Sequence, residues 1–167
     1  MNMTQKTIVD KQVLEQFLEK SEAVGNENIL LSAEAFQKTI QEMSFEYIDL
    51  PAFQITKDVK AGEKGIAAAL VEVDFGIAET GSVVADSKNE NKRLATCLAE
   101  KLVVMLPLSK VVPQLHHVAA FMEERTASDG GYVAFITGAS RTADIERVLT
   151  VGVHGPKEMV VYIVNDL

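Results

Sequence analysis

Met159-Val160-Val161-Tyr162-Ile163-Val164 is a continuous apolar run with the length of one β-strand. Residues 102–106 and 132–136 form two further runs of this kind. Strands that are apolar at every position are typical of a mainly parallel sheet that is covered on both faces. Helical patterns separate these runs, so the sequence predicts an α/β fold with three layers, α/β/α, around a mainly parallel sheet.

Apolar side chains recur at helical spacing in five segments, and Ser32 suits an N-cap. In the segment over residues 94–101, Cys97 belongs to the apolar stripe, where a thiol usually behaves as a small buried hydrophobe. Residues 45–60 stay unassigned, because Pro51 interrupts a possible strand. Residues 70–75 and 83–85 predict two strands joined by a bend. The expected helices cover about residues 9–18, 36–43, 94–101, 112–122 and 143–149.

The 167 residues fit one domain, with a helical part over residues 1–60 and an α/β core over residues 61–167. There are 24 acidic and 16 basic residues, and the net charge of −8 argues against nucleic acid and anionic membranes as partners. No apolar stretch is long enough to span a bilayer or resembles a secretory signal, so we expect a cytoplasmic protein. One cysteine and three scattered histidines predict no metal site and no cofactor bound by this chain.

Polar residues bounded by glycines interrupt the strand pattern at three places, which are residues 76–82, 137–144 and 152–158. If the three loops share one edge of the sheet, they bound one pocket, as at the carboxyl ends of strands in open α/β proteins. The order and spacing of these motifs closely resemble the LUD domain of the LutC/YkgG family over roughly residues 70–167. No N-terminal motif matches.

The resemblance implies a fold similar to the NagB/RpiA/CoA transferase-like group. It also implies a role in bacterial L-lactate utilisation, beside two iron-sulfur partner proteins that oxidise lactate to pyruvate. Because this chain has one cysteine, any electron transfer would fall to those partners, which are expected to carry the iron-sulfur clusters. Fold kinship alone does not assign a reaction.

Glu79 is the candidate catalytic residue. Its position beside Gly81 resembles the Glu-x-Gly element with which CoA transferases form a covalent acyl intermediate, and a desolvated carboxylate can also act as a base. Alternatively, Glu79 contacts a ligand, or it accepts backbone N–H bonds that hold the bend while Thr80 and Ser82 satisfy neighbouring groups.

The second and third loops offer groups that could hold an anion. Ser140, Arg141 and Thr142 are expected to open a helix, where backbone N–H groups and a guanidinium could bind carboxylate or phosphate. An ion pair between Arg141 and Asp144 with a capping hydroxyl is the alternative. His154 could donate to a ligand or shuttle a proton, or it could simply bond to the backbone.

Three functions therefore remain open. The first is an accessory, non-redox component of a lactate-oxidising system that binds a small anionic or hydroxylated ligand. The second is an independent enzyme, CoA transferase-like or acting on sugar phosphates, that uses Glu79. The third is a structural or regulatory module. The expected ligand-binding residues are Thr80, Gly81, Ser82, Gly138, Ser140, Arg141, Thr142, Asp144, His154, Gly155, Lys157 and Glu158.

Overall fold

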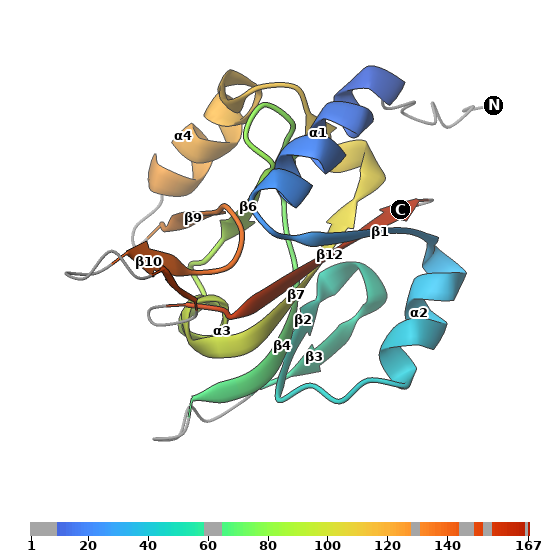
Figure 1. Ribbon diagram of the computed structural model, residues 1–167, viewed down its shortest axis with the longest axis vertical. Helices are drawn as coiled ribbons and strands as arrows, with labels where there is room; N and C mark the ends of the chain where they lie inside the picture. The colour runs from blue at the N-terminus through green and yellow to red at the C-terminus, as the bar shows by residue number, and fades with distance from the viewer. Residues whose placement is uncertain (1–9, 59–64, 128–130, 144–148, 152–154, 166) are drawn as a thin grey trace.

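A six-stranded sheet forms the centre of the computed structural model, which describes residues 10–58, 65–127, 131–143, 149–151, 155–165 and 167 (Figure 1). The strand order is β1-β12-β7-β4-β2-β3, and every neighbouring pair is parallel except β2 with β3. The strands, in chain order, are β1 (Glu27–Ser32), β2 (Tyr47–Leu50), β3 (Ile55–Lys57), β4 (Ile66–Glu72), β7 (Ala99–Pro107) and β12 (Glu158–Asn165). The prediction of a mainly parallel sheet is confirmed.

The two faces of this sheet carry separate apolar clusters, because successive side chains of a strand point to opposite faces. Val103 and Met105 of β7 pack in the cluster that contains Phe36 of α2 (Ala33–Gln41). Leu102 and Val104 pack in the other cluster, with α1 (Lys11–Ala23) and α3 (Glu90–Leu98). Helices therefore cover both faces, as predicted.

A second sheet packs on the face that carries α1 and α3. Its order is β8-β5-β6-β9, with β5 (Phe75–Ile77), β6 (Ser82–Asp86), β8 (Val111–Val112) and β9 (Val133–Ile136). The chain leaves the main sheet directly after β4, where Val73 N–H still donates to Met105 O at 3.0 Å and Asp74 N–H donates to Val84 O at 2.7 Å. The expected single strand over residues 70–75 is therefore two strands, and β5 with β6 forms the expected hairpin.

Strand β9 differs from the sequence prediction. Residues 132–136 do form a strand, but it is an edge strand of the second sheet and it pairs antiparallel with β6. Tyr132 and Phe135 are 49% and 41% exposed. The prediction of a strand buried on both faces is therefore wrong for this apolar run, because its side chains are only partly covered.

Other expected elements also change. Strand β1 separates α1 from α2 and was missed. The expected helix over residues 112–122 is the end of β8, a 3-10 turn η3 (Leu115–Val118) and the start of α4 (Ala119–Ala127). The unassigned residues 45–60 contain β2, the short turn η1 (Pro51–Phe53) and β3, and a further turn η2 (Leu108–Lys110) follows β7. Cys97 is exposed, so its interpretation as a buried residue was wrong.

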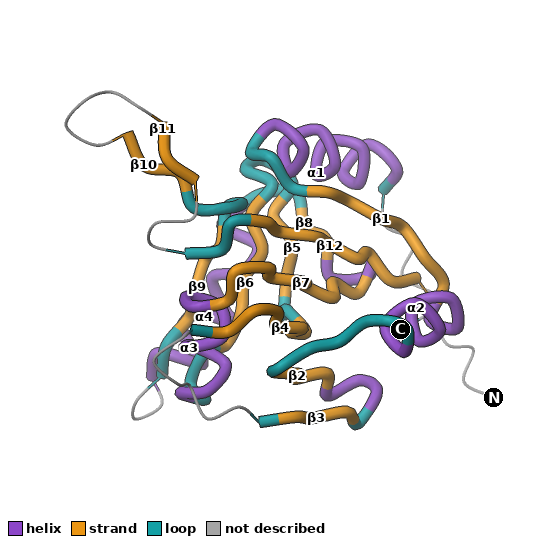
Figure 2. The backbone as a smooth tube through the Cα atoms, turned by 60° about the horizontal axis from the view of Figure 1, so that its bottom comes forward, coloured by secondary structure: helices purple, strands orange, loops and turns teal. Residues whose placement is uncertain are grey.

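The helix expected over residues 143–149 is wrong at both ends. Ala143 belongs to β10 (Arg141–Ala143) and Leu149 to β11 (Leu149–Val151), which pair antiparallel, and residues 144–148 lie outside the described part. Figure 2 shows this strand pair projecting away from the two sheets.

Polar side chains fix the starts of the three N-terminal helices. Asp10 Oδ1 accepts the N–H of Gln12 at 2.9 Å at the start of α1. Ser32 Oγ accepts the N–H of Ala35 at 3.2 Å, which confirms the expected N-cap of α2. Asn89 caps α3 in the same way. Each cap satisfies backbone donors that have no partner within the helix.

Phe17 joins α1 to the sheet and to the hairpin, and it is fully buried. We expect Phe17→Ala to lower the free energy of unfolding by about 3–5 kcal/mol, because it leaves a cavity between the layers. The matched control Phe135→Ala removes a partly exposed ring and should cost about 1 kcal/mol or less. Urea unfolding measures both, and equal losses would contradict the assignment of Phe17 to the core.

Candidate functional site

The bend at Glu79 is a tight turn that packs against the end of α1. Gly81 has φ 68° and donates its N–H to Ile77 O at 2.9 Å. A Cβ atom at Gly81 would overlap the backbone of Lys20 and Ser21. Only glycine allows both the left-handed conformation and this close approach.

Glu79 ties the turn to the segment that precedes η3. Its Oε1 accepts the N–H of Leu115 at 2.6 Å, and its own N–H donates to Pro113 O at 3.0 Å. Thr80 Oγ1 accepts the N–H of Ser82 at 3.4 Å. These bonds agree with the interpretation in which the carboxylate holds the bend, and they leave its second oxygen as a possible ligand acceptor.

The first and second loops meet beside the α1–β1 turn. Ser82 Oγ lies 2.6 Å from Thr137 Oγ1. Gly138 has φ 84°, and a Cβ atom there would lie 2.6 Å from Val24 O and 3.2 Å from Asn26 Oδ1. The structure therefore brings Ser82 and Gly138, two of the sequence-predicted residues, to one place.

A buried amide network lies at the same turn. Asn26 Nδ2 donates to Ser21 Oγ at 3.0 Å, and Ser21 Oγ donates to Asn28 Oδ1 at 2.8 Å. Within the described residues, the buried atoms Asn26 Oδ1 and Asn28 Nδ2 have no hydrogen-bond partner. If both side-chain amides were rotated by 180°, Asn26 would be left with the unused donor and Asn28 with the unused acceptor. The pair therefore offers one unused donor and one unused acceptor in either orientation. Buried polar atoms without a partner are rare and call for an explanation.

The third loop packs on the second. Ser140 N–H donates to Pro156 O at 2.8 Å, and a Cβ atom on Gly155 would lie 3.1 Å from Ser140 Cβ. Arg141 and Thr142 lie in strand β10, so the expected anion site at a helix start is not formed by these two residues. Asp144 and His154 lie outside the described residues.

Lys157 and Glu158 are at the amino end of β12 and are exposed. Lys157 Nζ lies 3.2 Å from Glu100 Oε1, and Glu158 Oε2 lies 3.4 Å from Lys101 Nζ. Because Ser140 and Gly155 also pack just before β12, the second and third loops lie at the amino end of this strand. They do not lie at the carboxyl edge of the sheet, where open α/β proteins hold their ligands, and the pocket shared by all three loops stays a prediction.

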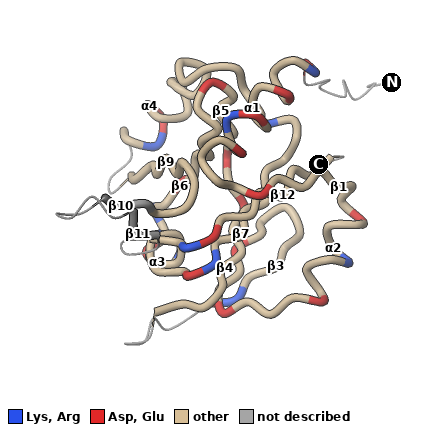
Figure 3. The backbone as a smooth tube through the Cα atoms, viewed as in Figure 1, with Lys and Arg blue, Asp and Glu red and all other residues tan. Residues whose placement is uncertain are grey.

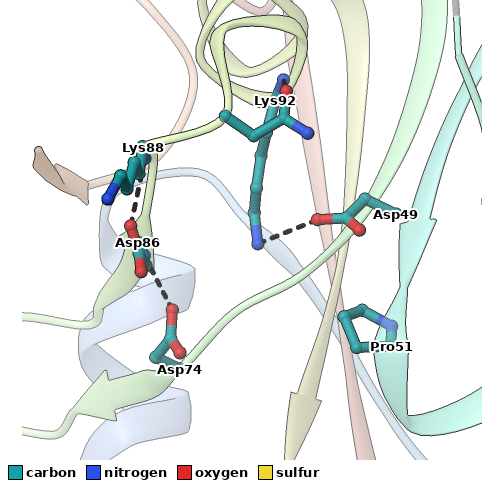
Figure 4. A pocket seen from close by; sticks show the side chains of 7 residues that line it. Asp49, Pro51, Asp74, Asp86, Lys88 and Lys92 are labelled. Carbon is teal, nitrogen blue, oxygen red and sulfur yellow. Dashed lines mark hydrogen bonds and ion pairs between the residues drawn. The ribbon is translucent and has the colours of Figure 1, made fainter. Parts of the chain in front are cut away.

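The carboxyl ends of β2 and β4 hold a separate cavity of about 560 Å³, which the sequence did not reveal (Figure 4). A smaller cavity of about 190 Å³ adjoins it and shares Asp74. Figure 3 shows acidic and basic residues next to one another around α3 and β4. The lining residues of the larger cavity are Asp49, Pro51, Asp74, Asp86, Lys88, Asn89 and Lys92.

Lys92 is the buried cation of this cavity. Its side chain is 9% exposed, and its Nζ lies 3.1 Å from Asp49 Oδ2 (Figure 4). Asp74 Oδ2 accepts the N–H of Asp86 at 2.7 Å, and Asp86 Oδ2 lies 3.1 Å from Arg125 Nε. The position of Lys92 in the first turn of an amphipathic helix gave no signal of burial, because long cationic side chains usually extend to solvent there.

Glu72 lines the smaller cavity, near Asp49 and Asp74. Burial raises the pKa of its carboxyl group, although the N–H of Ala52, which donates to Oε2 at 2.8 Å, and the charge of Lys92 act in the opposite direction. Burial also raises the pKa of Tyr47, and the charge of Asp49 adds to this effect. Both directions are those expected when burial disfavours the charged form of an acid.

No group of three potential metal ligands occurs among the described residues. None of the helices in the described part of the chain is long and apolar enough to cross a membrane.

The model of the LUD domain family matches residues 12–164. The chain belongs to the LUD domain family. The match extends well beyond the residues on which the sequence resemblance was based, and it includes the N-terminal part, which was expected to be helical but contains β1, β2 and β3 besides α1 and α2.

Several curated proteins are similar to this LUD domain. Lactate utilization protein C of Geobacillus kaustophilus is 40% identical over 96 residues, which cover 56% of this chain and 40% of that protein. The protein of the same name from Geobacillus thermodenitrificans is 36% identical over 109 residues, 64% of this chain and 45% of that protein. The uncharacterized protein YkgG of Escherichia coli is 26% identical over 153 residues, 86% of this chain and 65% of that protein. The chain thus spans less than half the length of the first two relatives.

Among solved structures, a DUF162 family protein from Deinococcus radiodurans has the same fold. The TM-score is 0.61 at 18% identity, and the match covers 94% of this chain and 99% of that one. This likeness supports the α/β fold, and kinship with the NagB/RpiA/CoA transferase-like group stays a prediction.

The turn of the LUD domain at Gly81 should tolerate no side chain. We expect Gly81→Ala to lower the free energy of unfolding by at least about 1 kcal/mol more than Gly65→Ala, because overpacking adds to the backbone strain. Gly65 is the matched control: its φ is 75°, but a Cβ atom there would lie at an ordinary 3.5 Å from Leu98 O. Equal losses in urea unfolding would show that the turn does not pack on α1.

Glu72 should make folding depend on pH. Because its pKa is raised in the folded state, folding takes up protons, and the stabilisation present at low pH is lost as pH rises from 4.5 through the raised value. We expect Glu72→Gln to remove this loss, so that the variant gains stability relative to wild type across that window. Glu46→Gln is the control, since Glu46 is exposed and its Oε2 also accepts a backbone N–H, from Ala67 at 2.9 Å. The same pH effect in both variants would contradict the role of burial.

Proposed function

We propose that this LUD domain serves bacterial L-lactate utilisation in the cytoplasm as a non-redox component, and that it binds a small anionic or hydroxylated ligand. The observation that carries the proposal is the 40% identity to a Lactate utilization protein C, together with the family match over residues 12–164. A single cysteine, which is exposed, fits a component that leaves electron transfer to iron-sulfur partner proteins.

The meeting of the first two loops supports ligand binding between the Glu79, Ser140 and His154 loops. Ser82 and Thr137 contribute hydroxyls 2.6 Å apart, and two buried amide atoms without a described partner, Asn26 Oδ1 in the adjoining turn and Asn28 Nδ2 in β1, lie beyond them. A hydroxy acid has a hydroxyl that can donate and a carboxylate that can accept, so it could use both amide atoms. Lactate has this chemistry.

Glu79 acts in this proposal as a residue that positions the turn. Its carboxylate is already engaged by the N–H of Leu115 at 2.6 Å, which favours this role over that of a CoA transferase-like nucleophile or of a base in an independent enzyme. The two roles differ in what they require: positioning needs an acceptor oxygen, whereas nucleophilic or base catalysis needs the carboxylate itself.

A complementation experiment separates these roles. Deletion of the gene should abolish growth on L-lactate and leave growth on glucose unchanged. Glu79→Gln keeps an acceptor for the N–H of Leu115 and should restore growth on lactate, whereas Glu79→Ala should not restore it fully. Loss of growth with Glu79→Gln, in a protein that melts at the wild-type temperature, would favour catalysis instead. Unchanged lactate growth of the deletion strain would refute the proposed role.

Ligand and partner binding can be measured on the purified protein. L-lactate or pyruvate should raise the melting temperature, because a ligand that binds only the folded state stabilises it. Asn28→Ala should weaken this effect, and Asn91→Ala, a control on α3 whose partly buried amide donates to Asp58 Oδ1 instead, should not. Native co-purification should recover iron-sulfur proteins. If these proteins are recovered while neither acid binds, the module acts through its partners alone.

A further inference from the structure

The cavity at the carboxyl ends of β2 and β4 is distinct from the loops used by the proposed function. The β5–β6 hairpin connects the two places: Asp74 and Asp86 are at its open end, and the Glu79 turn closes the other end. Carboxyl ends of parallel strands are the usual ligand edge of an open α/β sheet. The cavity has about 560 Å³, within the range of small-molecule sites.

Two of its carboxylates retain capacity to accept hydrogen bonds. Both oxygens of Asp86 are engaged, by the N–H of Lys88 at 3.0 Å and by Arg125 Nε at 3.1 Å. By contrast, the described bonds of Asp74 and Asp49 each use Oδ2, with Asp86 N–H and with Lys92 Nζ respectively. A carboxylate accepts through two oxygens, so one oxygen on each side of the cavity remains for a ligand.

The cavity also contains donors. The Lys92 side chain is directed into the space between Asp49 and Asp74, and an ammonium has three N–H groups, of which the ion pair with Asp49 needs one (Figure 4). Asn89 Oδ1 accepts the N–H groups of Asn91 and Lys92, so its amide NH₂ group remains as a donor at the wall. Donors and acceptors thus line one space.

The charges select a class of ligand. A small anion would meet three carboxylates, and a cation would approach the buried ammonium of Lys92 and the nearby Lys88. A metal ion is not favoured, because no described group of three ligands has suitable geometry. A hydroxyl group both donates and accepts, and it carries no charge to desolvate.

We propose that this cavity binds a small neutral polyol. Its hydroxyls donate to Asp49 and Asp74, and its oxygens accept from Lys92 and Asn89. The adjoining cavity extends the site past Asp74 to the rings of Phe75 and Phe121, whose centroids are 5.2 Å apart and which offer an apolar wall for the carbon chain. This site is independent of lactate and of the Glu79 turn.

The experiment uses ribitol as the probe on the full chain, with saturation-transfer NMR and amide shifts of the ¹⁵N-labelled protein as readouts. We expect saturable binding, with shifts at Asp74, Asn89 and Lys92. Asp74→Asn keeps one acceptor for the N–H of Asp86 and turns the other into a donor, so binding should weaken about tenfold, equivalent to one lost hydrogen bond. Lys92→Met should weaken it at least as much. Glu90→Gln, an exposed change in the first turn of α3 that does not line the cavity, should leave it unchanged.

Absence of saturable ribitol binding to the wild-type protein overturns the proposal, and so does binding that Asp74→Asn leaves unchanged. The variant Asp74→Asn decides the matter even if Lys92→Met fails to fold. Stronger binding of 1,4-diaminobutane or of L-lactate at the same shifted residues would show that the site selects a cation or an anion, and would equally overturn it. A negative result here has no bearing on growth on lactate.

Discussion

The close packing of the β5–β6 hairpin against α1 and β7 is the constraint on which the arrangement of this LUD domain depends. A Cβ atom on Gly76 would lie 2.6 Å from Leu106 Cδ2 and 3.0 Å from Phe17 Cε2, so the strand approaches the core more closely than a side chain would permit. Gly81 allows an equally close approach of the turn to the backbone of α1. Without these two glycines the hairpin would move away from the sheet, and both ends of it would lose their neighbours.

This packing gives the two ends of one hairpin different surroundings. The closed end meets the turn between α1 and β1, where the backbones of Gly81 and Gly138 pack closely and a hydroxyl and amides are bonded together. The open end meets the carboxyl edge of the main sheet, where Asp74 and Asp86 join Asp49 and Lys92. The hairpin thus separates two sites with different chemistry, which lie at its opposite ends.

Part of the fold could be predicted because the residue pattern of a single segment is enough to identify some strands and helix starts. The continuous apolar runs of β7 and β12 identify buried parallel strands, and Ser32 identifies a helix start. Strand β1 was not predictable in this way, because it is an edge strand whose side chains are all exposed or only partly buried. The pattern around residues 141–151 gave a wrong prediction of a helix. In so short a segment, the spacing of apolar residues alone does not distinguish a helix from a pair of strands.

Of the two candidate sites, one could be predicted from a single segment of the sequence and the other could not. The Glu79 turn was found because glycines and polar residues lie together in the sequence, and local chemistry is visible there. The cavity was missed because its walls come from residues 49, 74, 86 and 92, which are joined only by the parallel pairing of β2 with β4 and by the position of α3. Contacts between residues that are distant in the sequence arise from the fold. A single sequence reveals such contacts only where the residues belong to a recognisable motif.

The presence of a buried ion pair between Lys92 and Asp49 is better explained by the cavity beside it than by a contribution to the stability of the fold. Taking two charges out of water costs several kcal/mol per ion, and a buried pair of this kind is often no more stable than apolar residues of the same size. Apolar residues would have filled the space beneath α3 without that cost. A buried ammonium beside a cavity with acceptors on two sides has instead the properties of a preorganised polar group, because its orientation is fixed before any ligand arrives.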